Sequence, residues 1–209
     1  MKDVFVPPER LERWLDRFAE RHGATTYQAA ADVVAVTAAD GVRAACHVPF
    51  PPLAVDDARP YGGLLAHASR ERTVGVILVR RGGYAAGVFR GRTLVASKVG
   101  SRQVQGRTAA GGQSQRRFAR RREKQTREAF EAAADVAARV IGPEAGRLDA
   151  VVLGGDKAAV ARVMDDPRLA SLRTLVVDDH LAVPDPKLAV LKETPRDYRA
   201  VRIRLTEPA

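Results

Sequence analysis

The sequence has one cysteine, Cys46, and four histidines among its 209 residues. A single cysteine cannot form a disulfide within the chain, and it provides no pair with the spacing of a zinc site. Cys46 lies in an apolar run, so we expect it in the core. The histidines are scattered without metal-ligand spacing, so we expect no bound metal; they are His22, His47, His67 and His180.

Long apolar runs are also missing from the chain. No stretch approaches the roughly 20 apolar residues that span a bilayer, and the N-terminal residues lack the apolar core of a signal peptide. A content of 45% hydrophobic and 29% charged residues is typical of a globular protein with a buried core. We expect a cytoplasmic protein that does not contact membranes.

Acidic residues are nearly absent from the segment 98–124, where Glu123 is the only one. This segment carries a net charge of +8 out of the +10 of the whole chain. Charge concentrated in this way indicates binding to a polyanion. The basic residues that we expect to bind phosphates are Lys98, Arg102, Arg107, Arg116, Arg117, Arg120, Arg121, Arg122 and Lys124.

Apolar periodicity and turn residues predict an α/β protein. The expected helices cover residues 8–22, 114–141 and about 157–164. The expected strands cover residues 32–39, 42–48, 73–79, 84–90, 93–99, 148–153 and 175–177, and residues 188–191 are expected to pair with 201–205. These elements predict one domain over residues 1–209, with a mixed β-sheet flanked by helices and with the N-terminal helix and first hairpin included.

The segment 100–113 has no apolar periodicity, and we expect it to be a mobile loop in the free protein. It ends in Gly111, Gly112 and Gln113. Two adjacent glycines permit backbone conformations that other residues avoid, and they leave room for the loop tip to enter a narrow cavity. Gln113 offers an amide and a backbone N–H, which can orient a water and stabilise charge on a leaving oxygen.

The helix that follows this loop starts against the usual electrostatic preference. A helix N-terminus carries partial positive charge and favours acidic residues, yet the first turns here contain five arginines between residues 116 and 122. A sequence that departs from this electrostatic preference without gaining local stability in return indicates a functional site. The helix dipole and the arginines together predict a phosphate-binding surface next to Gln113.

Six stretches of the chain carry a resemblance to a known family. The sequences GGQS at 111–114 and RFAR at 117–120 resemble the middle domain of the eukaryotic and archaeal class-one peptide chain release factors. The strand-like residues 74–79 and 83–89, and the motifs GGDK at 154–157 and DPRL at 166–169, match the same domain in the same order. The resemblance covers about residues 73–180 and implies a fold of RNase H-like topology.

The chain departs from those release factors in its flanks. About 70 residues precede the matched core and about 30 follow it, and we expect both to belong to the same fold rather than to a codon-reading domain or a GTPase-binding domain. The chain is therefore most similar to the compact release-factor-like peptidyl-tRNA hydrolases of ribosome quality control, which include an actinobacterial branch. The resemblance implies codon-independent release of nascent peptides and no cofactor.

The same resemblance implies the partners and the site residues. The partners would be the large ribosomal subunit, its rRNA and peptidyl-tRNA, with the protein acting as a monomer. Gln113 would be the catalytic residue, with Gly111 and Gly112 setting its backbone inside the peptidyl-transferase centre. Two other functions stay open on the residues alone: a nuclease that cuts the acceptor end of tRNA, and a non-catalytic module that binds the ribosome or RNA.

Overall fold

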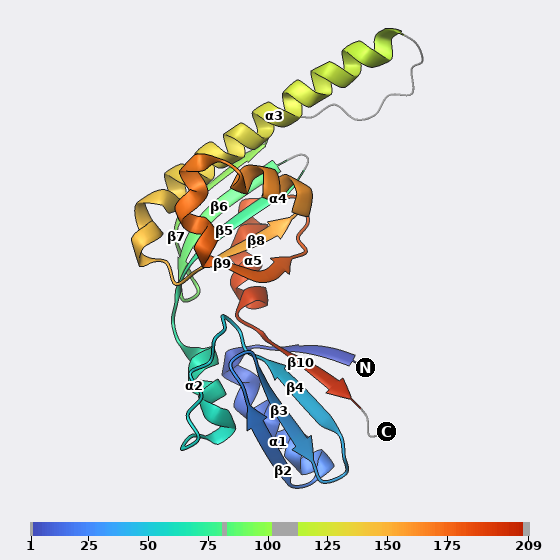
Figure 1. Ribbon diagram of the computed structural model, residues 1–209, viewed down its shortest axis with the longest axis vertical. Coiled ribbons are helices and arrows are strands. Elements are labelled where there is room, and N and C mark those ends of the chain that lie inside the picture. Colours follow the sequence, from blue (N-terminus) through green and yellow to red (C-terminus); the bar gives the residue numbers. More distant parts are fainter. Residues whose placement is uncertain (1, 81–82, 102–112, 207–209) are drawn as a thin grey trace. The chain divides into compact units, whose positions relative to one another are not determined.

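The computed structural model describes residues 2–80, 83–101 and 113–206, and of residues 113–122 the backbone alone. The chain divides into two compact units (Figure 1). Unit 1 comprises residues 1–71 and 195–209, and unit 2 comprises residues 72–194. None of the described helices is long and apolar enough to cross a membrane.

Unit 1 is an antiparallel sheet of five strands in the order β1-β10-β4-β3-β2. Helices α1 and α2 pack on it through a core that includes Leu11, Leu15, Val34 and Ile203. Helix α1 ends at the predicted glycine, because Gly23 has a φ of +88° and its N–H donates to Ala19 O. The elements are β1 Lys2–Val6, α1 Pro8–His22, β2 Thr25–Ala29, β3 Val33–Ala38, β4 Arg43–His47, the 3₁₀ turn Pro60–Gly63, α2 Leu64–Ser69 and β10 Val201–Thr206.

Unit 2 is a mixed sheet of five strands in the order β7-β6-β5-β8-β9. Strands β5, β8 and β9 are parallel, and β6 runs antiparallel to both β5 and β7. The elements are β5 Thr73–Arg80, β6 Gly83–Arg90, β7 Thr93–Ser101, α3 Gln113–Ile141, the 3₁₀ segment Gly142–Arg147, β8 Ala150–Gly155, α4 Lys157–Met164, the 3₁₀ segment Pro167–Leu175, β9 Val176–Leu181 and α5 Leu188–Tyr198. This is the RNase H-like topology that the resemblance implies.

Helices flank both faces of the unit 2 sheet. On one face α3 and α4 bury Ala137 and Val160 against Ile77 and Val88. On the other face Leu191 of α5 approaches Gly87 so closely that a Cβ there would lie 3.0 Å from the leucine side chain. The predicted α/β class with a mixed sheet flanked by helices is therefore confirmed.

The described strands form two sheets, and the mixed sheet is one of them. The N-terminal helix and first hairpin form a second sheet with its own core, because their apolar side chains pack against α2 and β10 rather than against the mixed sheet. Whether the two units act as one catalytic domain over residues 1–209 stays a prediction. The chain returns to unit 1 within α5, whose last residues, Pro195–Tyr198, belong to that unit.

The expected strand at residues 188–191 is wrong, because these residues begin α5. The buried residues of this helix are Leu191, Thr194, Pro195 and Tyr198, which recur at three- and four-residue spacing. Because two of these buried residues are a threonine and a proline, the sequence does not show a helical periodicity of apolar residues here. Its expected partner, residues 201–205, does form a strand, but β10 pairs with β1 and β4.

Candidate functional site

Helix α3 carries the candidate site and is anchored through its C-terminal half. Ala133, Ala134, Ala137 and Ile141 are buried in the core of unit 2, and among the side chains described for this helix, from residue 123 on, Phe130 is the first that packs against this core. The 17 residues before Phe130 extend for about 25 Å along the helix axis, at 1.5 Å per residue. Figure 1 shows this part of α3 projecting beyond the sheet.

One of the three predicted catalytic residues, Gln113, lies at the far end of this projecting segment. Gln113 is the first residue of α3, one position before the predicted start. Gly111 and Gly112 lie outside the described residues. The first N–H groups of a helix have no acceptor within the helix, and the end of the helix has partial positive charge. The backbone at Gln113 therefore belongs to the part of α3 best suited to meet a developing negative charge.

The predicted phosphate-binding residues divide into three groups. Arg102 and Arg107 lie outside the described residues. Lys98 is exposed on β7, and Lys124 is exposed on α3 with its Nζ 3.9 Å from Oε1 of Glu128. The remaining five occupy consecutive turns of α3 directly after Gln113, where the backbone alone is described: Arg116, Arg117, Arg120, Arg121 and Arg122.

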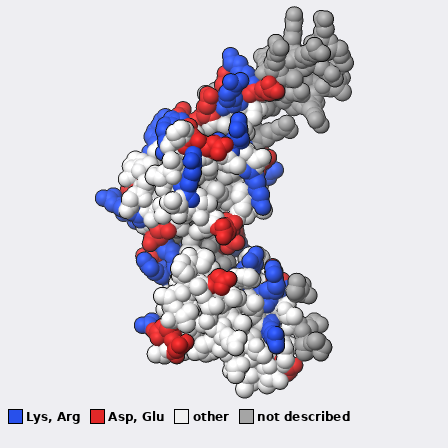
Figure 2. Space-filling model, viewed as in Figure 1, with Lys and Arg blue, Asp and Glu red and all other residues white. Residues whose placement is uncertain are grey.

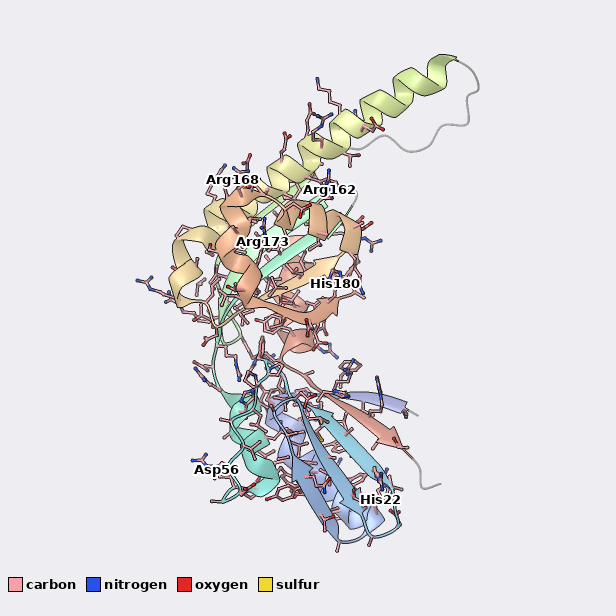
Figure 3. All side chains as sticks on the ribbon, viewed as in Figure 1. His22, Asp56, Arg162, Arg168, Arg173 and His180 are labelled. Carbon is pink, nitrogen blue, oxygen red and sulfur yellow. The ribbon has the colours of Figure 1, made fainter. Side chains whose placement is uncertain are left out.

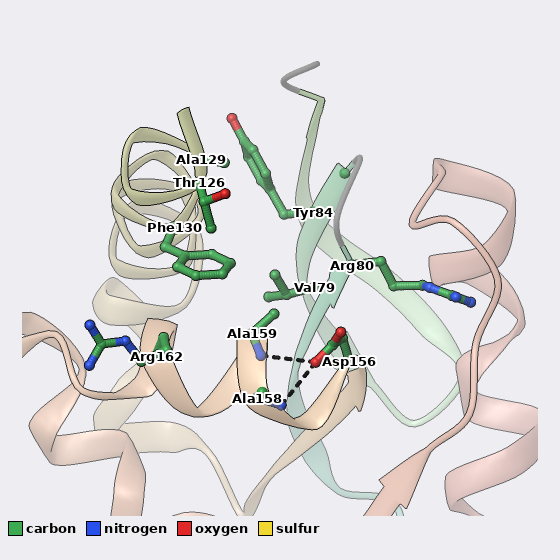
Figure 4. Close-up of a pocket in the computed structure, with 11 residues that line it drawn as sticks. Val79, Arg80, Tyr84, Thr126, Ala129, Phe130, Asp156, Ala158, Ala159 and Arg162 are labelled. Atoms are coloured by element: carbon green, nitrogen blue, oxygen red, sulfur yellow. Dashed lines mark hydrogen bonds between the residues drawn. The ribbon is translucent and has the colours of Figure 1, made fainter. Parts of the chain in front are cut away.

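A cavity of about 320 Å³ lies where β5 and β8 end beneath α3 (Figure 4). Its apolar wall includes Val79 and Phe130, and its polar groups include Tyr84, Thr126 and Asp156. Ligand sites in α/β sheets often lie at the carboxyl ends of parallel strands. The sequence analysis missed this cavity because its residues come from separate elements and form no motif.

The glycine turn at the floor of this cavity is a helix start, as predicted. Asp156 caps α4, and its Oδ1 accepts the backbone N–H groups of Ala158 at 3.0 Å and Ala159 at 3.1 Å. Gly155 precedes it with a φ of +99°. The carboxylate of Asp156 is therefore committed to the helix cap.

A second cavity, of about 260 Å³, shares Phe130 and Arg162 with the first and continues along α3 and α4. Arg162 Nη1 lies 3.8 Å from Oδ2 of Asp165, and both side chains are mostly exposed. The polar groups that line this cavity have both charge signs, so it does not extend the basic surface predicted for residues 98–124.

The DPRL motif ties α3 to the rest of unit 2. Arg168 donates from Nε to Asp166 Oδ1 at 2.9 Å and from Nη2 to Oδ2 at 2.7 Å, and its Nη1 also pairs with Asp135 of α3. The guanidinium hydrogen bond from Arg168, with the backbone N–H of the same residue, lowers the pKa of Asp166 to about 2. Figure 3 labels Arg168 together with Arg173, whose Nε donates to Met164 O at 2.8 Å.

The cysteine is a core residue, and two of the histidines contact groups of the protein itself. Cys46 is fully buried, as predicted, and burial raises the pKa of its thiol to about 12. The His22 ring contacts Asp40, and Nε2 of His180 lies 2.9 Å from Gly155 O. Among residues 2–80, 83–101 and 113–206 no three His, Cys, Asp or Glu side chains are grouped to hold a metal ion.

A sequence model of the Actinobacteria/chloroflexi VLRF1 release factor family matches residues 72–204. The chain belongs to this family. The VLRF1 match covers the whole unit 2 sheet and confirms the predicted relationship to compact release factors. No protein of curated function matches the chain.

Three solved structures are similar to this chain. The archaeal translation termination factor aRF1 is 16% identical over 94% of this chain and 63% of its own, with a TM-score of 0.48. The Vms1 mitochondrial localization core is 8% identical over 84% of this chain and 76% of its own, with a TM-score of 0.46. Pelota of Archaeoglobus fulgidus is 12% identical over 93% of this chain and 60% of its own, with a TM-score of 0.34. The chain thus spans less than two thirds of the aRF1 and Pelota chains.

Proposed function

We propose that this protein is a peptidyl-tRNA hydrolase that releases nascent peptides from stalled or split ribosomes without reading a codon. The observation that carries the proposal is the position of Gln113 at the N-terminus of a helix that is anchored in unit 2 and projects beyond its sheet. The release-factor family supports the same reaction class. The proposed partners are the large subunit, its rRNA and the tRNA, and the protein would act in the cytoplasm as a monomer.

The proposed reaction is hydrolysis of the ester between the peptide and the tRNA ribose. Gln113 orients a water molecule whose oxygen attacks the carbonyl carbon, and the bond from that carbon to the ribose oxygen breaks. The backbone N–H at Gln113 stabilises the charge on the departing oxygen. One proton of the water passes to the ribose oxygen, so the tRNA regains its hydroxyl, and the other is lost to solvent, so the peptide leaves as a carboxylate. Gly111 and Gly112 give the backbone the freedom that this approach needs.

The arginines after Gln113 have a separate role in this proposal. Arg116, Arg117, Arg120, Arg121 and Arg122, with Lys98, Arg102, Arg107 and Lys124, bind phosphates of rRNA or tRNA. Phosphate contacts hold the protein in position but perform no bond cleavage. We therefore expect mutation of the basic residues to weaken binding, and mutation of Gln113 to slow bond cleavage without weakening binding.

The test uses large ribosomal subunits that carry labelled peptidyl-tRNA, with peptide and tRNA followed together. Gln113→Ala keeps the backbone N–H but removes the side-chain amide that orients the water, so it should slow peptide release by about 10²-fold and should leave subunit binding unchanged. The matched control is Gln115→Ala, which removes the same side chain two residues later. Undiminished release by Gln113→Ala would overturn the mechanism.

The two alternative functions give different products in the same assay. A nuclease would shorten the tRNA, which a denaturing gel resolves from tRNA with an intact acceptor end. A non-catalytic module would bind the subunit tightly without producing free peptide or cut tRNA. Either result would replace the hydrolase assignment.

A further inference from the structure

The unit 1 sheet has two unlike faces. Side chains alternate along a strand, and on one face Val34, Cys46 and Ile203 are buried against α1 and α2. Figure 1 shows α1 behind the strands of this sheet. The opposite face, which we call the outer face, carries the alternate residues of β1, β2, β3, β4 and β10.

An aromatic ring and a guanidinium lie side by side on the outer face. Phe5 of β1 pairs directly with Arg202 of β10, and the Phe5 side chain is 64% exposed. Residues that pair directly across strands have Cβ atoms about 5 Å apart. The outer face thus presents an exposed aromatic ring next to a cation, Arg202.

The centre of the outer face carries small side chains. Ala45 of β4 pairs with Ala35 of β3 on one side and with Arg204 of β10 on the other. The next strand adds Gln28 opposite Ala35 and Thr26 opposite Thr37. Small side chains in the middle and hydrogen-bonding side chains at the border leave a platform on which a planar group can lie.

The charge of the outer face is positive. It carries Arg43, Arg202 and Arg204, and Asp3 is the single acidic residue at the outward positions of the described strands of this sheet. Asp3 is matched to Arg204, whose Nε and Nη2 donate to its carboxylate at 2.9 and 3.1 Å. Arg43 and Arg202 are therefore left to give the face its net charge. Figure 2 shows basic side chains gathered beside β10 in this view.

We propose that the outer face of the unit 1 sheet binds single-stranded RNA, with a base stacked on Phe5 and phosphates at Arg43 and Arg202. Aromatic side chains on a flat sheet bind unstacked bases, whereas bases inside a duplex are unavailable for stacking. The flanking arginines complement the phosphate charge, which favours RNA over an apolar protein partner. The proposal goes beyond peptide release, because the family match leaves out residues 1–71.

The experiment measures binding of the full-length protein to a labelled single-stranded RNA of about ten nucleotides by fluorescence anisotropy. Phe5→Ala should weaken binding about tenfold, because stacking of one base contributes roughly 1–3 kcal/mol. Phe5→Tyr should restore the affinity, since it keeps an aromatic face. The affinity for an RNA duplex of the same sequence should be the same for both variants as for the wild type.

The arginines are tested through the salt dependence of the same binding. The double variant Arg43→Gln, Arg202→Gln should reduce the slope of log K against log salt by about 1.4, or 0.7 for each lost phosphate contact. The matched control is Arg13→Gln, Arg17→Gln, which removes the same charge from exposed positions of α1. That control should keep the wild-type slope.

Two results would overturn this proposal. One is an unchanged affinity of Phe5→Ala for the single strand, and the other is the same slope for the Arg43, Arg202 variant and the α1 control. Gln113→Ala should bind this RNA like the wild type. A failure of the release chemistry and a failure of the RNA platform would thus appear in different assays.

Discussion

Gly155 lies so close to Val79 that a Cβ on the glycine would be 2.2 Å from the Val79 carbonyl oxygen. The same glycine has a φ of +99°, which side-chain-bearing residues rarely adopt. We therefore predict that Gly155→Ala lowers the free energy of unfolding by about 3 kcal/mol, from backbone strain and steric overlap together. Chemical denaturation followed by circular dichroism measures this change.

The control for this prediction is Gly146→Ala. A Cβ at Gly146 would meet nothing within 4 Å, so its substitution should change stability by less than about 1 kcal/mol. If Gly155→Ala were as stable as Gly146→Ala, the close packing of β8 against β5 at this turn would be contradicted.

Local elements were predictable where one periodic segment ends at a clear signal. The helix over residues 8–22 matches α1 in both bounds, since Leu11, Leu15 and Phe18 share a face and Gly23 ends it. The strands β5, β6 and β7 likewise follow from apolar runs separated by glycine turns. These signals act over a few residues, so the sequence contains them in full.

Pairings between distant segments were not predictable. Strand β1 begins with two charged residues and is only five residues long, and its partner β10 lies at the other end of the chain. Tyr84, Thr126 and Asp156 meet in the cavity only because three separate elements converge there. The glycine and glutamine motif was recognisable in advance, although Gly111 and Gly112 lie outside the described residues.

The pairing of Asp166 with Arg168 predicts a loss of stability in acid. The pKa of Asp166 is lowered to about 2 from an ordinary value of 3.8 by its hydrogen bonds to Arg168. The group therefore stabilises the fold above pH 4, and this contribution disappears as the pH falls towards 2. Asp166→Asn should flatten the pH dependence of Tm in this interval and lower Tm at pH 7 by about 2 °C, because exposed ion pairs contribute little.

Asp165→Asn provides the matched comparison for the acid experiment. Its carboxylate lies 3.8 Å from Arg162 and is 72% exposed, whereas Asp166 accepts hydrogen bonds from both the side chain and the backbone of Arg168. Asp165→Asn should follow the wild-type curve between pH 4 and 2. Identical curves of Tm against pH for the two variants would show that the Asp166–Arg168 pair does not contribute to stability.

Phe130 is predicted to hold the projecting part of α3. It lines both cavities and is the first of the described α3 side chains to pack against the core. Phe130→Ala should lower the free energy of unfolding by about 2 kcal/mol, less than for a fully buried ring because Phe130 is only partly buried. Hydrogen exchange should accelerate at α3 amides before residue 130 and stay slow in β5.

Phe130→Leu separates packing from other effects, because it keeps an apolar group of similar size in the two cavities. It should retain most of the protection of α3. Peptide release should fall for Phe130→Ala and recover for Phe130→Leu if the helix must hold Gln113 in place. Equal hydrogen-exchange rates at the α3 amides of the two variants would show that the Phe130 side chain does not hold this part of the helix.

The arginines that follow Gln113 should govern affinity rather than the rate of the bound complex. In the triple variant Arg116→Gln, Arg117→Gln, Arg120→Gln, three phosphate contacts are lost, so the slope of log K against log salt for ribosomal subunits should fall by about 2. Arg13→Gln, Arg17→Gln, Arg21→Gln on α1 removes equal charge as the control. At saturating protein the first variant should still release peptide at close to the wild-type rate, since the amide of Gln113 is intact. A normal salt slope together with slow release at saturation would reverse this assignment, because it would place the arginines in the reaction itself rather than in binding.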